Sequence, residues 1–366
     1  MKNNFFYKYI LVIFFSFSFL SLVQAQEQFS FDVTQIEISN NGNLYKGLKR
    51  GTITTIDGIF IVADKFTYNK ITNILDAEGK VKIEDVVNNY VIFSDTAKYK
   101  KNEEIIITEG NSKGIDDKKR VITSNKFTYN KITNILDAEG KVKIEDVTKD
   151  YEIESEILTY FRNIDKITTK GFTKANIENK YKIESENLSY LLNNKEFSSK
   201  NKSKIKDNNN QVYFLDEFIF LVDKSLLKGK NVLTITNYNL PKSDKFFFLD
   251  GIFDLKNKFF TASDTKINIH KSIFDRNEND PRIYGISSKR VDNLTTINKG
   301  IFTTCQKREG CPPWSIKSQK IEHDKNKKQI SYKNAFLNVY DMPVFFFPKF
   351  FHPDPTVIRQ SGFLRP

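Results

Sequence analysis

Apolar and polar residues alternate with a period of two over most of the chain, which predicts β-strands with one buried face. The segment from Leu75 to Ile83, for example, places every second side chain on one face. A three-residue step interrupts the alternation at regular intervals, as between Ala63 and Phe66. We expect a β-bulge or bend at such steps, because it returns the following side chains to the inner face. No helical periodicity persists beyond two turns.

The strands belong to a tandem repeat. The same 22-residue segment, KFTYNKITNILDAEGKVKIEDV, stands at 65–86 and at 126–147. A tyrosine recurs at about half of that spacing, at Tyr68, Tyr99, Tyr129, Tyr160 and Tyr190, and Phe220 takes the next position. Each unit of about 30 residues therefore reads as one hairpin, and stacked units would share a continuous apolar interior. We predict an all-β, elongated two-sheet structure, either a β-solenoid or a β-jellyroll opened into a trough. The alternation leaves open whether the interior is dry or holds a ligand.

The first 25 residues have the features of a secretory signal. Lys2 and Lys8 supply positive charge, an apolar run covers 10–22, and 23–25 is a cleavage site of the small-residue type. We expect cleavage between Ala25 and Gln26 and hence export, which makes a disulfide possible. The rest of the chain has no uninterrupted apolar run long enough for a membrane-spanning helix.

The composition provides enough apolar residues for a core and gives the chain a basic net charge. The 366 residues are 39% hydrophobic, with 33 Phe and 16 Tyr, and the formal net charge is +12. A basic balance is compatible with nucleic acid, an anionic membrane surface or an acidic ligand, but the frequent Lys, Asn, Ile and Phe also suit an AT-rich genome. We expect no nucleic-acid partner.

Motifs of catalysis are missing from the sequence: it has no GxSxG, HExxH, P-loop or dinucleotide fingerprint. Carboxylates recur near the strand ends at Asp64, Asp95, Glu156 and Glu186 and could suggest a glycosidase, but their repetition favours structural positions. Cys305 and Cys311 together with His323 and Asp324 fit no standard zinc spacing, and a disulfide or free thiols are the alternatives. Proline on both sides of Asp354 indicates a rigid turn. We expect no enzymatic activity, no cofactor and no metal site.

The last 66 residues differ in composition, with both cysteines, the only Trp and seven of the nine prolines. Their characteristic positions are Thr303–Cys305, Trp314, His323, Asp324, Pro343, Pro348, Pro353, Asp354, Arg359 and Gly362. In this order they resemble the end of the periplasmic domain of the lipopolysaccharide-assembly outer-membrane protein family (LptD, also called OstA or organic solvent tolerance protein). The upstream repeats resemble the OstA-like domain of the same family, so the resemblance covers nearly all of the chain after the signal.

The resemblance implies a fold and a function. It implies a twisted β-jellyroll with an apolar inner trough over 26–300, and an end of the jellyroll with a junction to an outer-membrane β-barrel over 301–366. Such a domain receives lipopolysaccharide from a periplasmic bridge protein by edge-strand addition and passes it to a barrel plugged by an outer-membrane lipoprotein. It would lie at the periplasmic face of the outer membrane. The candidate lipid-contacting residues are Phe66, Tyr68, Leu75, Val81, Ile83, Phe127, Tyr129 and Leu136. Cys305 and Cys311 are the disulfide candidates.

The sequence departs from the family in two respects. The chain ends at Pro366, where the family's barrel would begin, and the family's first cysteine, near the start of the mature chain, is missing. Cys305 takes the family's later position, and it pairs either with Cys311 or with cysteines of a barrel. Two alternatives therefore stay open. One is a free-standing periplasmic lipopolysaccharide-bridge or binding protein, and the other is an enzyme or adhesin built on a β-solenoid.

Overall fold

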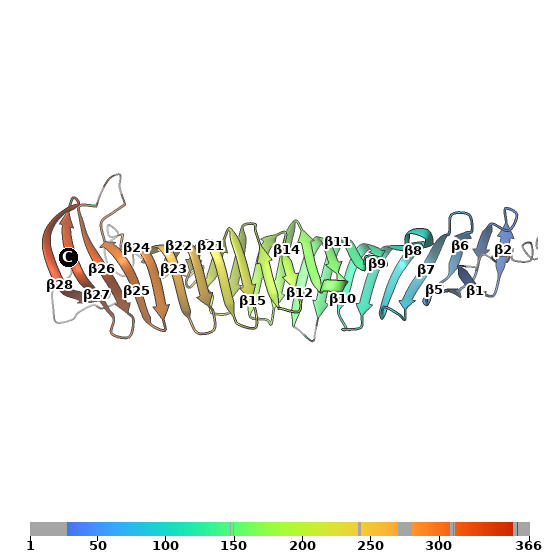
Figure 1. Cartoon of the computed structure of the whole chain (residues 1–366), viewed down its shortest axis with the longest axis horizontal. Coiled ribbons are helices and arrows are strands. Elements are labelled where there is room, and N and C mark those ends of the chain that lie inside the picture. Colours follow the sequence, from blue (N-terminus) through green and yellow to red (C-terminus); the bar gives the residue numbers. More distant parts are fainter. Residues whose placement is uncertain are drawn as a thin grey trace, which may run out of the picture.

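The computed structural model describes residues 28–353 and 357, except 147, 149, 241–242, 270–279, 308–309 and 311. The predicted signal over 1–25 lies outside the described residues. The described chain forms one long antiparallel β-sheet of 28 strands, and its two ends lie at opposite ends of an elongated, twisted molecule (Figure 1). This confirms the predicted all-β architecture of tandem hairpins.

The strands of the sheet are β1 (Phe29–Val33), β2 (Ile36–Ser39), β3 (Leu44–Gly47), β4 (Gly51–Thr55), β5 (Ile59–Ala63), β6 (Lys65–Asn69), β7 (Ile74–Asp85), β8 (Tyr90–Lys100), β9 (Ile105–Asp116), β10 (Val121–Asn130), β11 (Ile135–Asp146), β12 (Tyr151–Phe161), β13 (Lys166–Lys170), β14 (Phe172–Ile177), β15 (Tyr181–Glu186), β16 (Ser189–Leu191), β17 (Glu196–Ser199), β18 (Ser203–Asp207), β19 (Val212–Leu215), β20 (Glu217–Leu221), β21 (Leu226–Ile235), β22 (Lys245–Asp254), β23 (Phe259–Asn268), β24 (Arg282–Val291), β25 (Leu294–Thr303), β26 (Trp314–Asp324), β27 (Gln329–Val339) and β28 (Met342–Pro353). The long strands pair in chain order, whereas among the shorter strands some pairings skip neighbours in the chain, as between β1 and β4, β3 and β6 or β15 and β18. Two single 3₁₀ turns, η1 (Lys101–Glu103) and η2 (Arg162–Ile164), connect neighbouring strands.

Each long strand bends at its middle, and the bend folds the single sheet into two layers. In β7, residues 74–78 pair with β6, whereas residues 82–85 pair with β5. We call the layer that contains β6 the A half and the layer that contains β5 the B half. The same division continues along the sheet, because every hairpin pairs A with A and B with B.

The bends lie in a line that we call the spine. The predicted bulge in the first strand of the repeat is present, as the register shift between Thr123 and Lys126 in β10 shows. The second strand is bent as well: Gly79 and Lys80 both have positive φ, so Gly79 belongs to the bend and not to the inner face as the alternation suggested. A Cβ at Gly79 would lie 2.7 Å from a carboxylate oxygen of Asp64. This contact and the left-handed φ of +80° explain why a glycine recurs there.

The recurring carboxylates are therefore placed at the spine. Asp64 accepts a hydrogen bond from Arg50, and Asp95 accepts one from Asn111. These two acids repeat in space as they do in sequence and pack against the bend of the neighbouring strand. Their surroundings are those of structural positions, in agreement with the interpretation of their periodicity.

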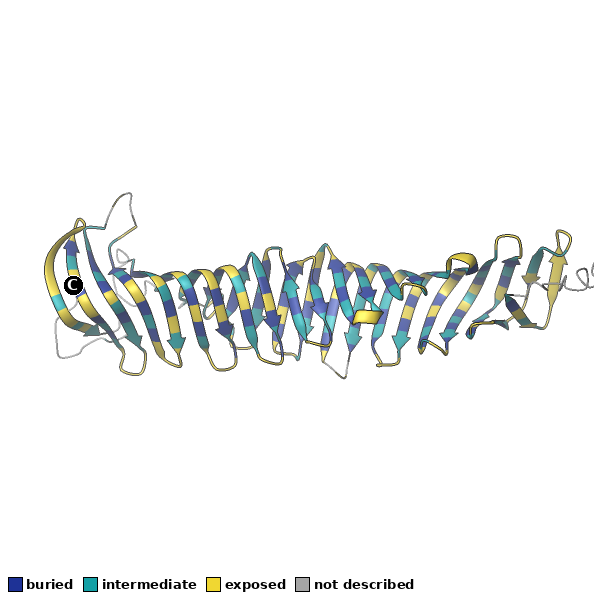
Figure 2. Cartoon of the chain, viewed as in Figure 1, coloured by how far each residue is buried: buried dark blue, intermediate teal, exposed yellow. Residues whose placement is uncertain are grey.

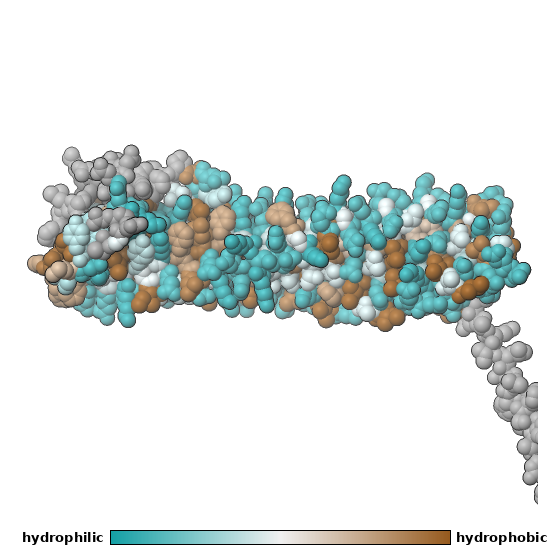
Figure 3. Space-filling view, turned by 90° about the horizontal axis from the view of Figure 1, so that it is seen from above, coloured by the Kyte–Doolittle hydropathy of each residue, from teal (hydrophilic) through white to brown (hydrophobic). Residues whose placement is uncertain are grey.

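The core lies between the two halves. Buried and more exposed residues alternate along most strands (Figure 2). The face seen in Figure 3 is mostly hydrophilic with scattered apolar side chains. One row of register partners runs through the A half from strand to strand on the inner face. In order it comprises Tyr45, Tyr68, Leu75, Tyr99, Ile106, Tyr129, Leu136, Tyr160, Ile167, Tyr190, Phe197, Phe220, Leu227, Phe253 and Phe260. We call this set the A-half row.

Both ends of the sheet carry strands with one unpaired edge. At the N-terminal end, β1 pairs with β4 and β2 pairs with β3, and in the described chain neither has a second partner. At the C-terminal end, β28 pairs with β27 alone among the described strands. The sheet continues without a break across residue 300, within β25. The assignment of 301–366 to a barrel junction stays a prediction.

Candidate lipid-binding interior and its mouth

The predicted lipid-contacting residues all point into the space between the halves. Phe66, Tyr68, Leu75, Val81, Ile83, Phe127, Tyr129 and Leu136 are each at most 7% exposed. They come from β6, β7, β10 and β11, and belong to one continuous hydrophobic core. Their inward position follows from the period of two in each half-strand. Contact with lipid stays a prediction.

Aromatic pairs join the two halves across this interior. Tyr90 of the B half meets Tyr129 of the A half with ring centroids 4.9 Å apart. The same edge-to-face contact recurs between Tyr151 and Tyr190, between Tyr181 and Phe220, and between Tyr213 and Phe253, at 4.9–5.5 Å. Each pair links the start of a B half-strand to the end of an A half-strand. The tyrosine ladder of the sequence is thus one side of a repeated cross-layer contact.

The side opposite the spine is formed by two rows of turns, which we call the mouth. The A-half turns are 70–73, 101–104, 131–134, 162–165, 192–195, 222–225 and 255–258, and the B-half turns include 56–58, 86–89, 117–120, 178–180 and 208–211. Because strands do not pair across the mouth, side chains of the turns make the contacts there.

One ion cluster closes the mouth near the N-terminal end. Asp57 of a B-half turn pairs with Lys101, at 3.0 Å, and with Lys131, both from A-half turns. Glu104 joins the same two lysines at 2.5 and 3.2 Å. Burial alone would raise the pKa of Asp57, but hydrogen bonds from Lys131 and Lys101 outweigh it and hold the pKa well below its usual range. Asp57 is therefore ionised at neutral pH, and its ion pairs join the two rows of turns.

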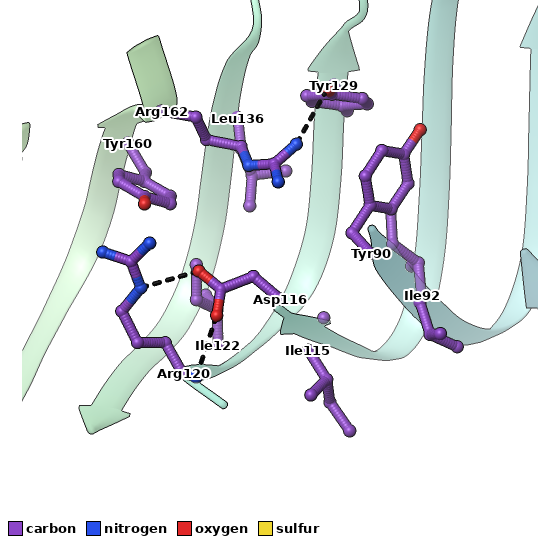
Figure 4. Close-up of a pocket in the computed structure, with 12 residues that line it drawn as sticks. Tyr90, Ile92, Ile115, Asp116, Arg120, Ile122, Tyr129, Leu136, Tyr160 and Arg162 are labelled. Carbon is purple, nitrogen blue, oxygen red and sulfur yellow. Dashed lines mark hydrogen bonds and ion pairs between the residues drawn. The ribbon is translucent and has the colours of Figure 1, made fainter. Parts of the chain in front are cut away.

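A second ion cluster lies two repeats further along. Arg120 of a B-half turn donates to Asp165 of an A-half turn at 3.0 Å. It also donates to Asp116 at 2.6 Å (Figure 4). Lys118 reaches the other oxygen of Asp165 at 2.5 Å, and the hydroxyl of Tyr160 donates to Asp165 at 3.0 Å. Burial alone would raise the pKa of Asp165, but Lys118, Arg120 and Tyr160 lower it to about 2. Arg120 is 3% exposed, so this contact is an interior ion pair.

Arg162 closes the mouth between these clusters. Its guanidinium donates to the carbonyl of Asn88 at 2.9 Å, which joins an A-half turn to a B-half turn. It also donates to the hydroxyl of Tyr129 at 3.2 Å and stacks over the ring of Tyr90 at 5.3 Å (Figure 4). Arg162 therefore covers the aromatic pair beneath it.

Below Arg162 and Arg120 the interior is packed. The space lined by residues such as Tyr90, Ile122, Tyr129 and Leu136 has a volume of about 40 Å³, which is room for one or two water molecules and not for an acyl chain. The sequence left the state of the interior open. In these repeats it is a filled core.

The pattern of the sequence did not reveal the mouth residues. Asp57, Arg120, Arg162 and Asp165 stand in turns, where the alternation of strands says nothing. Their partners across the mouth lie 44–74 positions away. One signal was present, since Arg120 and Arg162 replace the Asn and Lys that fill most other turns.

The motif of the terminal segment is only partly described. Trp314 begins β26, where its carbonyl accepts a hydrogen bond from Thr303 at 2.8 Å and its ring lies against Phe302. Asp324 accepts the backbone N–H of Asn326 and ends β26 in a turn. Pro343, Pro348 and Pro353 lie on the edge strand β28, where proline is tolerated. Asp354, Arg359 and Gly362 lie outside the described residues.

Only some of the residues in the cysteine and metal predictions are described by the structure. Cys305 is half-buried near the carbonyl of Trp314. Cys311 lies outside the described residues, so a bond between the two sulfurs stays a prediction. His323 points inward beside Ile330, one position before Asp324. Within the described ranges, no three His, Cys, Asp or Glu side chains gather as a metal site would require.

Comparison with known proteins gives a likeness to solved structures. No protein-family model matches the chain, and no curated protein sequence matches it significantly. Among solved structures it is similar to LptH of Pseudomonas aeruginosa, the LptA homologous periplasmic component of a lipopolysaccharide transport device, with 14% identity, 31% of this chain and 82% of that chain covered, and a TM-score of 0.29. In the described part of the chain, no helix has the length and apolar character needed to cross a membrane.

Proposed function

We propose that this chain is the periplasmic part of a lipopolysaccharide-assembly system of the outer membrane. It accepts lipopolysaccharide from a periplasmic bridge protein, shelters the acyl chains between its two halves and passes them toward an outer-membrane barrel. The chain works by binding and transfer and not by catalysis. The proposal is supported by the ordered motif of the terminal segment and by the geometry of the interior.

The observation that carries the proposal is the A-half row. Its positions from Tyr45 to Phe260 form an uninterrupted apolar track along the long axis of the molecule. A track of this kind presents the same surface at every repeat, so an acyl chain can advance along it without crossing water. A protein with a purely structural role would need only a packed core. It would not need the mouth, a side at which contacts between turns, and not paired strands, join the two halves.

The ion clusters of the mouth are weak compared with the free energy gained by sheltering acyl chains from water. A saturated chain of about 12 CH₂ groups gains roughly 10 kcal/mol on leaving water, at about 0.8 kcal/mol per CH₂. Loss of one partner from a buried ion pair costs about 3–5 kcal/mol, and an exposed pair contributes less than about 1 kcal/mol. Several acyl chains of one lipid therefore outweigh the contacts that a single ion cluster at the mouth contributes.

The sheet edges suit the proposed partners. At the N-terminal end, the unpaired edges of β1 and β2 can each accept a strand of a bridge protein. At the other end, β28 exposes Phe345 and Phe351, and it would continue into the barrel that an outer-membrane lipoprotein plugs. This arrangement would hold the chain at the periplasmic face of the outer membrane.

A second candidate is a free-standing periplasmic bridge protein. Unpaired edges at both ends of the described sheet favour it, since each end could then receive another β-jellyroll. An immunoblot of unboiled and boiled outer membranes separates the two. A heat-modifiable band well above 42.7 kDa supports the membrane assembly, whereas a band of mature size in the soluble periplasm supports the bridge.

The proposed entry route is tested by locking the mouth. In a chain with Cys305→Ser and Cys311→Ser, a short bis-maleimide joins Asn88→Cys to Arg162→Cys across the mouth. The matched control joins Asn73→Cys to Asn102→Cys, two neighbouring A-half turns whose side chains lie 2.9 Å apart. Binding of fluorescent lipopolysaccharide should be lost only with the lock across the mouth. Equal binding by both cross-linked proteins would overturn entry through the mouth.

A further inference from the structure

The A-half row changes its chemistry at one position. After Phe260 the next register partner is Arg290 on β24, followed by Thr295 and His323. Every earlier position from Tyr45 onward is aromatic or aliphatic. Arg290 is thus a permanently charged side chain on the track, at the inner face near the mouth.

Arg290 has no counter-ion close by. Its Nε donates to the hydroxyl of Thr295 at 2.9 Å, and its guanidinium lies 5.4 Å from the ring centroids of both Phe246 and Phe260. Across the described chain, no carboxylate oxygen comes within 4.0 Å of its nitrogens. Burial lowers the pKa of Arg290, and the negative charge of Asp244 partly offsets this effect. A guanidinium nevertheless stays charged in proteins. A half-buried cation without a carboxylate partner is poorly solvated, and an anion that arrives there is stabilised.

A cavity of about 240 Å³ opens at Arg290. It lies between the two rows of turns, with Tyr213 and Phe260 in its apolar wall and Lys258 and Lys325 among its lining residues. Its volume is slightly below the range of pockets for whole drug-sized ligands. The cavity therefore suits one polar group of a ligand, and a longer apolar part of the same ligand would lie along the A-half row.

Among the described residues, three acidic ones line this cavity, Asp207, Asp254 and Asp292. Asp292 forms no ion pair with Arg290, and the other two are engaged by their own turns. Asp207 accepts the backbone N–H groups of Asn209 and Gln211, at 2.9 Å each. Asp254 accepts those of Lys256 and Asn257 and the side-chain amide of Asn257. These carboxylates cap turns, as Asp324 does, and they do not reach Arg290. The cation therefore remains available to a ligand.

We propose that Arg290 and its cavity bind the phosphate group of an amphiphile whose acyl chains lie between the halves. A guanidinium offers a planar pair of donors that matches a phosphate, and a desolvated site strengthens the bond. Upstream of Arg290 every position of the A-half row is aromatic or aliphatic, so Arg290 is the first position of the row itself that offers a charge to a lipid head group. This inference rests on the proposed function, and it names the head-group site within it.

The test uses the mature chain 26–366 and three probes: a diphosphorylated lipid A, the same lipid without phosphates, and inorganic phosphate. Arg290→Gln should lose about tenfold or more in affinity for the phosphorylated lipid and should bind the dephosphorylated lipid as the wild type does. Arg290→Lys keeps the charge and should retain most of the affinity, which separates charge from folding. Lys289→Gln, on the opposite face of the same strand, is the matched control and should change neither affinity.

The outcomes separate the site from the proposed function. If Arg290→Gln binds phosphorylated lipid as tightly as the wild type, the head-group site is refuted. If inorganic phosphate displaces no lipid and binds wild type and Arg290→Gln equally, the cavity has no phosphate specificity and the inference fails too. If neither protein binds any lipid but only the wild type binds inorganic phosphate, the anion site stands and the proposed function falls.

Discussion

The ion pair of Asp165 offers the sharpest test of how the mouth is held. The carboxylate of Asp165 forms ion pairs with Lys118 at 2.5 Å and with Arg120 at 3.0 Å, and Asp165 is only 7% exposed. Asp165→Asn removes the charge and keeps the shape. It also suits the backbone, because Asp165 has a left-handed φ of +47°, a conformation that asparagine tolerates well.

The magnitude follows from the lowered pKa. A shift from 3.8 to about 2 corresponds to about 2 kcal/mol of folding stability at neutral pH. The folded-state pKa lies below the unfolded one, so this stabilisation is complete above the unfolded value and is lost as the pH falls through about 2. Asp165→Asn should therefore be less stable than the wild type by about 2 kcal/mol at pH 7, and the difference should shrink between pH 5 and pH 2.

The assay is urea unfolding followed by circular dichroism at pH 7, 4 and 2, with the slope of the transition checked for constancy. Asp76→Asn is the matched control, since its pair with Lys98 is exposed on both sides and is worth less than about 1 kcal/mol. A difference for Asp165→Asn that is the same at pH 7 and pH 2 would refute the reasoning. So would an equally large effect of Asp76→Asn.

Two further predictions concern the spine and the aromatic pairs. Gly110 and Gly171 both have φ near +80°, but a Cβ would lie 2.4 Å from Asp95 at Gly110 and would meet open space at Gly171. Both alanine variants should lose about 1 kcal/mol of folding stability through backbone strain, and Gly110→Ala should lose about 1 kcal/mol more through overlap with Asp95. Urea midpoints measure the two losses, and equal losses would contradict the packing of the spine. Tyr129→Phe removes hydrogen bonds with Asn134 at 2.7 Å and with Arg162 at 3.2 Å and should cost about 1–2 kcal/mol of folding stability. Amide hydrogen exchange should become faster around 86–90, where Arg162 contacts the carbonyl of Asn88. Unchanged exchange there would show that the position of Arg162 does not depend on Tyr129.

Local rules in the sequence were enough to predict the repeat and its inner face. The period of two identified Phe66, Leu75 and Phe127 as inward because each half-strand has one buried side. The three-residue step predicted the bend in the first strand of the unit. The bend in the second strand was missed, because Gly79 keeps an apparent period of two while two residues with positive φ occupy the bulge.

The features that govern entry depend on contacts far apart in the chain. Asp57 meets Lys131 across 74 positions, and only the folding of the sheet brings their turns together. Arg290 escaped notice for a related reason. More residues separate β23 from β24 in the sequence than separate the earlier neighbouring strands, so the regular spacing of the tyrosines no longer identifies the next position of the A-half row. Strand register, which the structure supplies, restores it.

The central claim is that acyl chains lie between the two halves, and photo-crosslinking tests it most directly. A benzophenone amino acid replaces Leu75 or Phe127 on the inner face, or the neighbouring Asp76 or Thr128 on the outer face, and cells are irradiated during lipopolysaccharide export. Adducts with lipopolysaccharide from the two inner positions and not from the outer ones are the result we predict. Adducts from the outer positions alone would contradict a lipid-carrying interior.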